Sequence, residues 1–209
     1  MSPDFREHAV GIILKDLFLY FGELDIDIYA YALTNANDQH YAHFKATATV
    51  FKDFTGYSEL EAAKEIYNDE IAVLIDLAGN TTFSKPGIFA LQPVKKQVHY
   101  MGYLDTMGAS FLPYTIADKI AISEEMQSGF SEQIIYLDHF AFLSPLEKST
   151  KKFTRSDFGL PENAFVFACF NSTQKMSPDW FEACMTILKQ CPNSVFWIFN
   201  NDSKEAEHN

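Results

Sequence analysis

One apolar run constrains the fold of this chain more than any other stretch. Residues Ile71 to Leu77 read IAVLIDL, and the run breaks into the turn Gly79-Asn80-Thr81-Thr82. A short, continuous apolar run that ends in an Asp and a Gly turn is typical of a parallel strand buried on both faces. Open α/β sheets bind their ligands at the carboxyl ends of such strands. We therefore expect the loops that follow, up to Asp118, to form one wall of a ligand site.

Helical and strand patterns alternate along the chain. Ala9 to Phe21 has apolar residues at helical spacing, and Ile26 to Leu33 alternates as a strand does. Ser58 is a predicted N-cap with Glu61 at the capping-box position, which predicts a helix that continues to Asn68. Further predicted elements are helices at 37–47 and 178–190, and strands at 49–54, 98–101, 114–117, 134–137, 164–170 and 194–199. This alternation predicts βαβ units, a mostly parallel sheet and therefore an α/β fold.

A polar and basic stretch, Ser144 to Arg155, predicts a boundary between two domains. We expect a Rossmann-like first domain at residues 1–143, a linker at 144–156 and the beginning of a second Rossmann-like domain at 157–209. The first domain opens directly in the loop Ser2-Pro-Asp-Phe, whereas a doubly wound sheet begins with a strand. The sequence therefore predicts that a first strand is missing, and that the sheet edge this exposes favours self-association.

Composition and charge narrow the classes of function. The 209 residues are 47% hydrophobic, which is enough for a sizeable core, and the formal net charge of -12 disfavours a nucleic-acid backbone binder. Three cysteines without metal spacing, Cys169, Cys184 and Cys191, fit reduced cytosolic thiols. Charged residues interrupt the N-terminal stretch, and no apolar run reaches the length of a membrane span. We therefore expect a cytoplasmic protein with no membrane or nucleic-acid partner.

Two residues are candidates for chemistry on position alone. His8 precedes the helix that begins near Ala9, where unpaired helix amides keep a histidine neutral and available as a base; the alternative is an exposed histidine without a role. Lys175 follows a strand and precedes a helix, a place that suits a diphosphate; the alternative is one more surface lysine.

Other candidates are weaker. The spacing of His40 and His43 favours a solvated helix face over a metal site. His99 and His139 are isolated and receive no role. Neither phosphate-loop fingerprint is present, and there is no nucleophile elbow.

Several segments, taken in their order along the chain, carry a family resemblance. The opening segment is SPDFREHAVG, and it is followed by DLAG, FAL, QV, GY, a Thr and a Gly two residues apart, FGLPE, FN with a lysine, and PNSV. Together they resemble the catalytic region of the SPINDLY-type, O-linked N-acetylglucosamine transferases, glycosyltransferase family 41. The resemblance covers about Ser2 to Phe199.

The resemblance implies two Rossmann-like domains and an inverting, metal-independent transfer of N-acetylglucosamine from UDP-GlcNAc to Ser or Thr of a protein acceptor. No cofactor is implied; UDP-GlcNAc is the donor substrate. His8 and Asp53 match the proposed catalytic residues, His8 as base or as a contact on the acceptor side and Asp53 as a second candidate acid. The residues that match the donor site are Gly102, Tyr103, Thr106, Asn171 and Lys175.

Asn80, Gln92 and the pair Leu104-Asp105 depart from the family's pattern. Leu104 adds bulk and Asp105 adds a negative charge to a loop that approaches an anionic nucleotide sugar. The resemblance also implies that part of the donor site lies beyond Asn209. The sequence therefore leaves a second function open, in which the chain is a catalytically inactive fragment or pseudoenzyme that acts as a protein-binding module.

Overall fold

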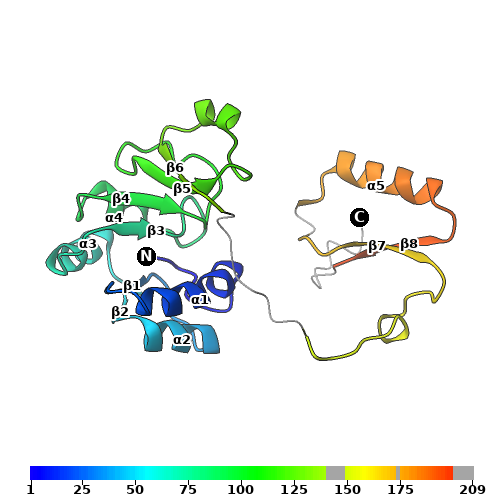
Figure 1. Cartoon of the computed structure of the whole chain (residues 1–209), viewed down its shortest axis with the longest axis horizontal. Coiled ribbons are helices and arrows are strands. Elements are labelled where there is room, and N and C mark those ends of the chain that lie inside the picture. The colour runs from blue at the N-terminus through cyan, green and yellow to red at the C-terminus, as the bar shows by residue number, and fades with distance from the viewer. Residues whose placement is uncertain (140–148, 173–174, 200–209) are drawn as a thin grey trace. The chain divides into compact units, whose positions relative to one another are not determined.

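The strands of the chain pair in parallel, as the alternation of elements predicts. The computed structural model describes residues 1–139, 149–172 and 175–199, and the chain divides into two units, Met1–Leu146 and Glu147–Asn209 (Figure 1). Much of the predicted linker at 144–156, two residues of the loop before Lys175 and the last ten residues lie outside the described residues. Within the described residues, no helix combines the length and the apolar character needed to span a bilayer.

Six strands of the first unit form two parallel groups (Figure 1). The first group is β1 (Tyr29–Ala32) beside β2 (Val50–Asp53). The second group is, in spatial order, β3 (Leu74–Asp76), β4 (Gln97–Tyr100), β5 (Tyr114–Asp118) and β6 (Gln133–Leu137).

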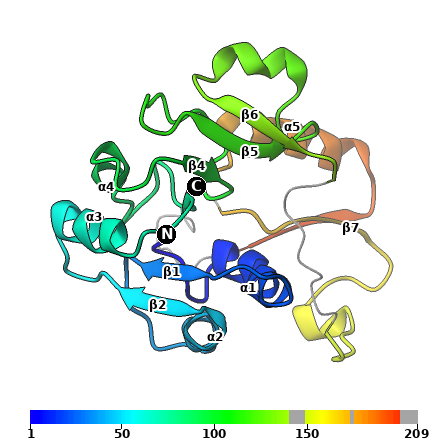
Figure 2. The same cartoon turned by 60° about the vertical axis from the view of Figure 1, so that its left-hand side comes forward.

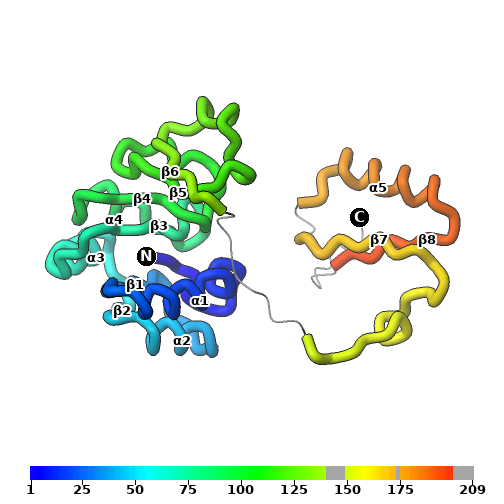
Figure 3. Tube along the Cα trace, in the orientation of Figure 1, coloured from blue at the N-terminus to red at the C-terminus, as the bar shows by residue number. Residues whose placement is uncertain are grey.

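The first two residues lie between these groups, in the position of a central strand (Figure 3). The Ser2 amide donates to the Tyr31 carbonyl at 3.1 Å, and the Ser2 carbonyl accepts from the Leu33 amide at 2.9 Å. On the other side, the Met1 carbonyl accepts from the Leu77 amide at 3.0 Å. Met1 and Ser2 therefore occupy an internal position, between β1 and β3, and not the outer edge of a sheet.

Helices cover both faces of this sheet (Figure 2). α1 (Ala9–Gly22) and α2 (Gln39–Thr47) contribute to one core, and α3 (Glu59–Asn68) and the short α4 (Pro86–Ala90) contribute to the other. The first core contains Phe5, Val10, Leu14, Phe18, Ala30, Ala32, Phe44, Leu77 and Met101. The second contains Met1, Tyr31, Leu33, Phe54, Ala62, Ala63, Ile66, Leu74, Ile88, Phe89, Val94 and Leu112. Alternate residues of β1 thus serve opposite cores, which is the arrangement of a strand buried on both faces.

Two of the predicted helix starts are confirmed in their hydrogen bonds. The Ser58 hydroxyl accepts from the Glu61 amide at 3.3 Å, and the Glu61 carboxylate accepts from the Ser58 amide at 2.9 Å, which completes the capping box of α3. Ser177 caps α5 (Pro178–Gln190) by accepting from the Trp180 amide at 3.2 Å.

The predicted strand at Ile71–Leu77 is regular only over Leu74–Asp76, and Val73 is 44% exposed. The reason lies in its neighbours. β3 pairs with β4 from Leu74 onward, and on its other side Met1 bonds to the Ile75 carbonyl and the Leu77 amide. Among the described residues, no strand pairs with the amino-terminal half of the apolar run.

The second unit is a single βαβ motif. β7 (Phe165–Cys169) pairs in parallel with β8 (Ser194–Ile198), and α5 connects them. A short 3-10 turn, η2 (Ser156–Phe158), precedes them and ends at Gly159, which has a φ of 64°. Among the described residues of this unit only Ala164 is buried, as expected for one motif that cannot cover both faces of its sheet.

Candidate functional site

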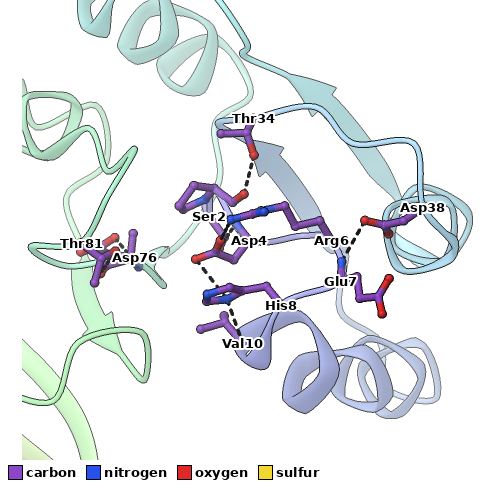
Figure 4. A network of polar contacts seen from close by, with 12 residues as sticks. Ser2, Asp4, Arg6, Glu7, His8, Val10, Thr34, Asp38, Asp76 and Thr81 are labelled. Atoms are coloured by element: carbon purple, nitrogen blue, oxygen red, sulfur yellow. Dashed lines mark hydrogen bonds and ion pairs between the residues drawn. The ribbon is translucent and has the colours of Figure 1, made fainter. Parts of the chain in front are cut away.

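The opening loop places His8 beside a buried carboxylate (Figure 4). The Asp4 side chain is only 9% exposed, and its two oxygens lie 3.0 Å from Arg6 Nη2 and 3.5 Å from His8 Nδ1. The Asp4 amide is held by the Ser2 hydroxyl at 2.9 Å. The His8 side chain is 41% exposed, so its ring lies beside the buried Asp4 and is also in contact with solvent.

His8 also caps α1, as its predicted place before the helix suggests. Its Nδ1 accepts from the Val10 amide at 3.3 Å. In this tautomer the proton of the neutral ring is on Nε2. If Nδ1 instead carries the proton, it can no longer accept from the Val10 amide. It then donates toward Asp4, and Nε2 has a free lone pair. Asp4, 3.5 Å from Nδ1, is the acceptor that would favour this second tautomer, in which Nε2 can take up a proton.

Asp53 ends β2, on the same side of the sheet as the loops that follow β1 and β3. Its carboxylate accepts from the Thr55 amide at 2.8 Å and from the Tyr41 hydroxyl at 3.2 Å. Partial burial opposes its ionisation, but the bonds from Thr55 and Tyr41 outweigh that effect and lower the pKa of Asp53. Asp53 is thus a carboxylate at neutral pH, which suits accepting a proton or facing positive charge; its catalytic role stays a prediction.

The loops after β3 and β4 lie in direct contact through glycines. A Cβ at Gly102 would overlap the Leu77 carbonyl, and a Cβ at Gly79 would overlap the side chain of Tyr103. Gly79 also has a φ of 59°, a conformation that favours glycine. These two glycines allow the loop at Gly102 to sit against the carboxyl end of β3, in the position where a ligand loop is predicted.

A buried pair that the sequence analysis left without a role lies beneath this contact. Asp76 and His99 are cross-strand neighbours of β3 and β4, and His99 is 1% exposed. His99 Nδ1 lies 3.2 Å from the Asp76 carboxylate, and Nε2 lies 2.6 Å from the Tyr103 carbonyl. Asp76 also accepts from the amides of Ala78 and Gly79, both at 3.0 Å. The signal in the sequence was the Asp at the end of a buried strand.

Thr106 is held by a second buried carboxylate. Its hydroxyl donates to Glu132 at 2.7 Å and accepts from the Gly108 amide at 3.1 Å and the Ser131 amide at 3.2 Å. Glu132 also accepts from the Met107 amide at 2.6 Å. These bonds anchor the loop to the start of β6. Donor binding by Thr106 stays a prediction.

The departures from the family's pattern are at exposed positions. Leu104 is 65% exposed, and Asn80 and Asp105 are exposed as well. The Asp105 carboxylate accepts from the Thr106 amide at 2.7 Å. Gln92 follows α4 with a φ of 49°. None of these side chains fills the contact between the two glycine loops.

The other two predicted donor residues, Asn171 and Lys175, belong to the second unit. Both are exposed, and they lie between the end of β7 and Ser177, the cap of α5. The Lys175 amide donates to the Ser172 carbonyl at 3.0 Å, which turns the chain toward the helix. This places a lysine within the last residues before a helix N-terminus, a setting that favours anions.

Comparisons with known proteins agree on one family. The model of the family described as Glycosyl transferase family 41 matches residues 1–151 and 144–208. The Arabidopsis thaliana protein named probable UDP-N-acetylglucosamine--peptide N-acetylglucosaminyltransferase SEC is 33% identical over 206 residues, which cover 95% of this chain and 21% of that protein. The Arabidopsis thaliana SPINDLY protein of the same designation is 26% identical over 200 residues, 93% of this chain and 22% of that protein. The chain thus spans about a fifth of the length of these relatives.

A solved structure confirms the predicted fold class. A mutant of the Thermobaculum terrenum O-GlcNAc transferase matches with a TM-score of 0.83 at 19% identity, over 94% of this chain and 37% of that chain. This likeness establishes the Rossmann-like α/β fold, including the beginning of a second domain of that type.

The glycine contact predicts a sharp effect of one methyl group. We expect Gly102→Ala to lower the free energy of unfolding by about 3 kcal/mol, because the new Cβ overlaps backbone atoms of Leu77 that belong to the sheet. Gly129→Ala is the matched control, since nothing lies within 4 Å of its Cβ position and we expect a change below about 0.5 kcal/mol. Thermal or urea denaturation compares the two; equal effects would mean that the loops do not pack as described.

Proposed function

The chain belongs to glycosyltransferase family 41, and from this premise we propose that it is the part of a protein O-glycosyltransferase that holds the catalytic histidine and one wall of the donor site. The reaction is an inverting transfer of N-acetylglucosamine from UDP-GlcNAc to a Ser or Thr hydroxyl of a protein, without a metal. The single observation that carries the proposal is the pairing of the half-exposed His8 with the buried Asp4.

This pairing suits a general base. The acceptor hydroxyl must lose a proton as it attacks the sugar carbon, and a neutral imidazole with a free Nε2 can take that proton. Asp4 stabilises the tautomer that leaves Nε2 free, and its charge then stabilises the imidazolium that forms. Arg6 also contacts Asp4, with Nη2 3.0 Å from the carboxylate, and so helps to fix this side chain in the loop.

The leaving group is a nucleoside diphosphate, which gains negative charge as the glycosidic bond breaks. Lys175, beside the N-terminus of α5, is our candidate to stabilise that charge. The loop at Gly102 and Tyr103 is our candidate for contact with the donor sugar, because glycine lets this loop pack directly on the carboxyl end of β3, the edge at which α/β sheets bind ligands. In this proposal the partners of the chain are a nucleotide sugar and a protein acceptor.

A second function, a binding module without transfer activity, is supported by the loop itself. Leu104 stands 65% exposed and Asp105 adds a negative charge next to the proposed donor site. Self-association through an exposed sheet edge is a separate proposal, and in this structure Met1 and Ser2 already bond to β3 and β1 at the position where that edge is expected. A chain that binds UDP or a protein but transfers no sugar would favour the binding module.

The first test concerns His8. We expect His8→Ala to lower sugar transfer to a Ser/Thr-containing peptide at least about 100-fold, because it removes the general base, while UDP affinity stays unchanged. Transfer is measured with radiolabelled UDP-GlcNAc. His40→Ala, which changes a histidine of α2, is the control and should keep full transfer. Full transfer by His8→Ala would exclude His8 as the base.

The second test concerns Lys175. We expect Lys175→Ala to weaken UDP binding about tenfold, because a charge-assisted contact to the diphosphate is lost. Lys189→Ala, in the last turn of the same helix α5, is the matched control and should change the affinity by less than about twofold. Isothermal titration calorimetry measures both. Equal effects of the two variants would contradict a diphosphate site at the start of α5.

A further inference from the structure

We propose that the buried His99 is a positioning residue. As an imidazolium it links the Gly102–Tyr103 loop to the carboxyl end of β3 through two hydrogen bonds, and when it loses a proton it loses the bond to the loop. This hydrogen-bonded link depends only on the geometry of the first unit. Its consequence for donor binding rests on the proposed function. His99 touches no solvent and so acts only through the loop that it holds.

The hydrogen bonds of His99 require both ring nitrogens to carry protons. Nε2 lies 2.6 Å from the Tyr103 carbonyl, which can only accept, so Nε2 must donate. Nδ1 lies 3.2 Å from an oxygen of Asp76, and both oxygens of this side chain already accept backbone amides, so Asp76 faces the ring as an acceptor. Nδ1 must donate as well, and a ring that donates from both nitrogens is an imidazolium.

The charged groups around the ring favour this state. Asp76 faces it from β3, and Glu132, buried at the start of β6, adds a second negative charge. Burial disfavours the charged ring, but the bonds to Asp76 and the Tyr103 carbonyl, together with the charge of Glu132, outweigh it and raise the pKa of His99 above its ordinary value.

Loss of the proton removes the hydrogen bond between His99 and the Tyr103 carbonyl. A neutral imidazole can donate from only one nitrogen, and the carboxylate of Asp76 is a stronger acceptor than the Tyr103 carbonyl. The proton therefore stays on Nδ1, and the Nε2 lone pair then faces the carbonyl oxygen and repels it. Tyr103 lies against Gly79 and follows Gly102, so this carbonyl is the point where the loop is fastened.

The direction of the pH dependence follows from the raised pKa. The stabilisation of the loop is fully present below pH 6.5, the ordinary value for histidine, and is lost as the pH rises through the higher value in the folded chain. The loop at Gly102–Thr106 should thus be ordered at mildly acid and neutral pH and loosened in alkaline solution.

The direct test is the protonation state of His99 by ¹⁵N NMR of the imidazole ring. We expect signals of two protonated nitrogens at pH 6.5, with the change to a single proton on Nδ1 as the pH rises through the raised pKa of His99. Hydrogen exchange gives the loop's response: protection of the Tyr103 to Thr106 amides, corrected for intrinsic exchange, should fall about tenfold between pH 6.5 and 8.5. The amides of Ile120 and Ala121, bonded to Asp118 in another loop, are the internal control and should keep their protection.

His99→Gln is the matched variant, since its amide can donate toward the Tyr103 carbonyl but cannot titrate. We expect its loop protection to be independent of pH. A singly protonated His99 at pH 6.5, or a wild-type loop whose protection does not change with pH, would overturn the proposal. If His99→Gln does not fold, the NMR and exchange measurements on the unchanged chain still decide it.

Donor binding separates this inference from the proposed function. UDP-GlcNAc, whose diphosphate does not titrate in this range, should bind the unchanged chain about fivefold more tightly at pH 6.5 than at pH 8.5, and His99→Gln with no such difference. Binding without pH dependence would overturn the positioning role and leave the proposed function standing. Absence of binding at every pH would overturn the proposed function, while the NMR and exchange measurements would still test the link between His99 and the loop.

Discussion

The Asp76 carboxylate is the group on which the carboxyl edge of the first unit depends. It accepts the amides of Ala78 and Gly79, which fixes the turn after β3, and it faces His99, which fixes the loop after β4. One buried side chain thus organises two segments, the turn after β3 and the loop after β4. A buried carboxylate is tolerated in the interior only when several donors surround it, and here the donors are the loops themselves.

The bonds made by Asp76 and His99 also explain why glycines occupy positions 79 and 102 of these loops. Once Asp76 fixes the turn at Ala78–Gly79 and His99 fixes the Tyr103 carbonyl, the two backbones meet with no room for a side chain at Gly79 or Gly102. The contact is therefore backbone against backbone. A wall built in this way is rigid and exposes peptide groups, which suits recognition of a polar ligand such as a sugar. Exposed side chains such as Leu104 can vary without altering it.

Features set by neighbours in sequence could be predicted, whereas features set by strand register could not. Ser58 with Glu61 and Ser177 with Pro178 determine helix starts within four residues, and α3 and α5 begin and end where the sequence indicated. His99 received no role because its partner Asp76 is 23 residues away and meets it only through the parallel register of β3 and β4. Glu132 escaped notice for the same reason, since it reaches Thr106 across 26 residues. The catalytic and donor residues came from the family resemblance; position alone indicated only His8 and Lys175.

The two histidines that lie beside aspartates differ in one respect that decides their roles. Both His8 and His99 have a buried carboxylate near Nδ1. At His99 the other nitrogen faces a carbonyl, so the ring has no lone pair to offer and can only hold structure. At His8 no carbonyl faces Nε2 among the hydrogen bonds of the described residues, and the ring is partly in solvent. An Asp–His pair therefore positions a loop when both nitrogens are occupied, and it can act as a base when the outer nitrogen is free. The position of one acceptor, the Tyr103 carbonyl, separates the two cases.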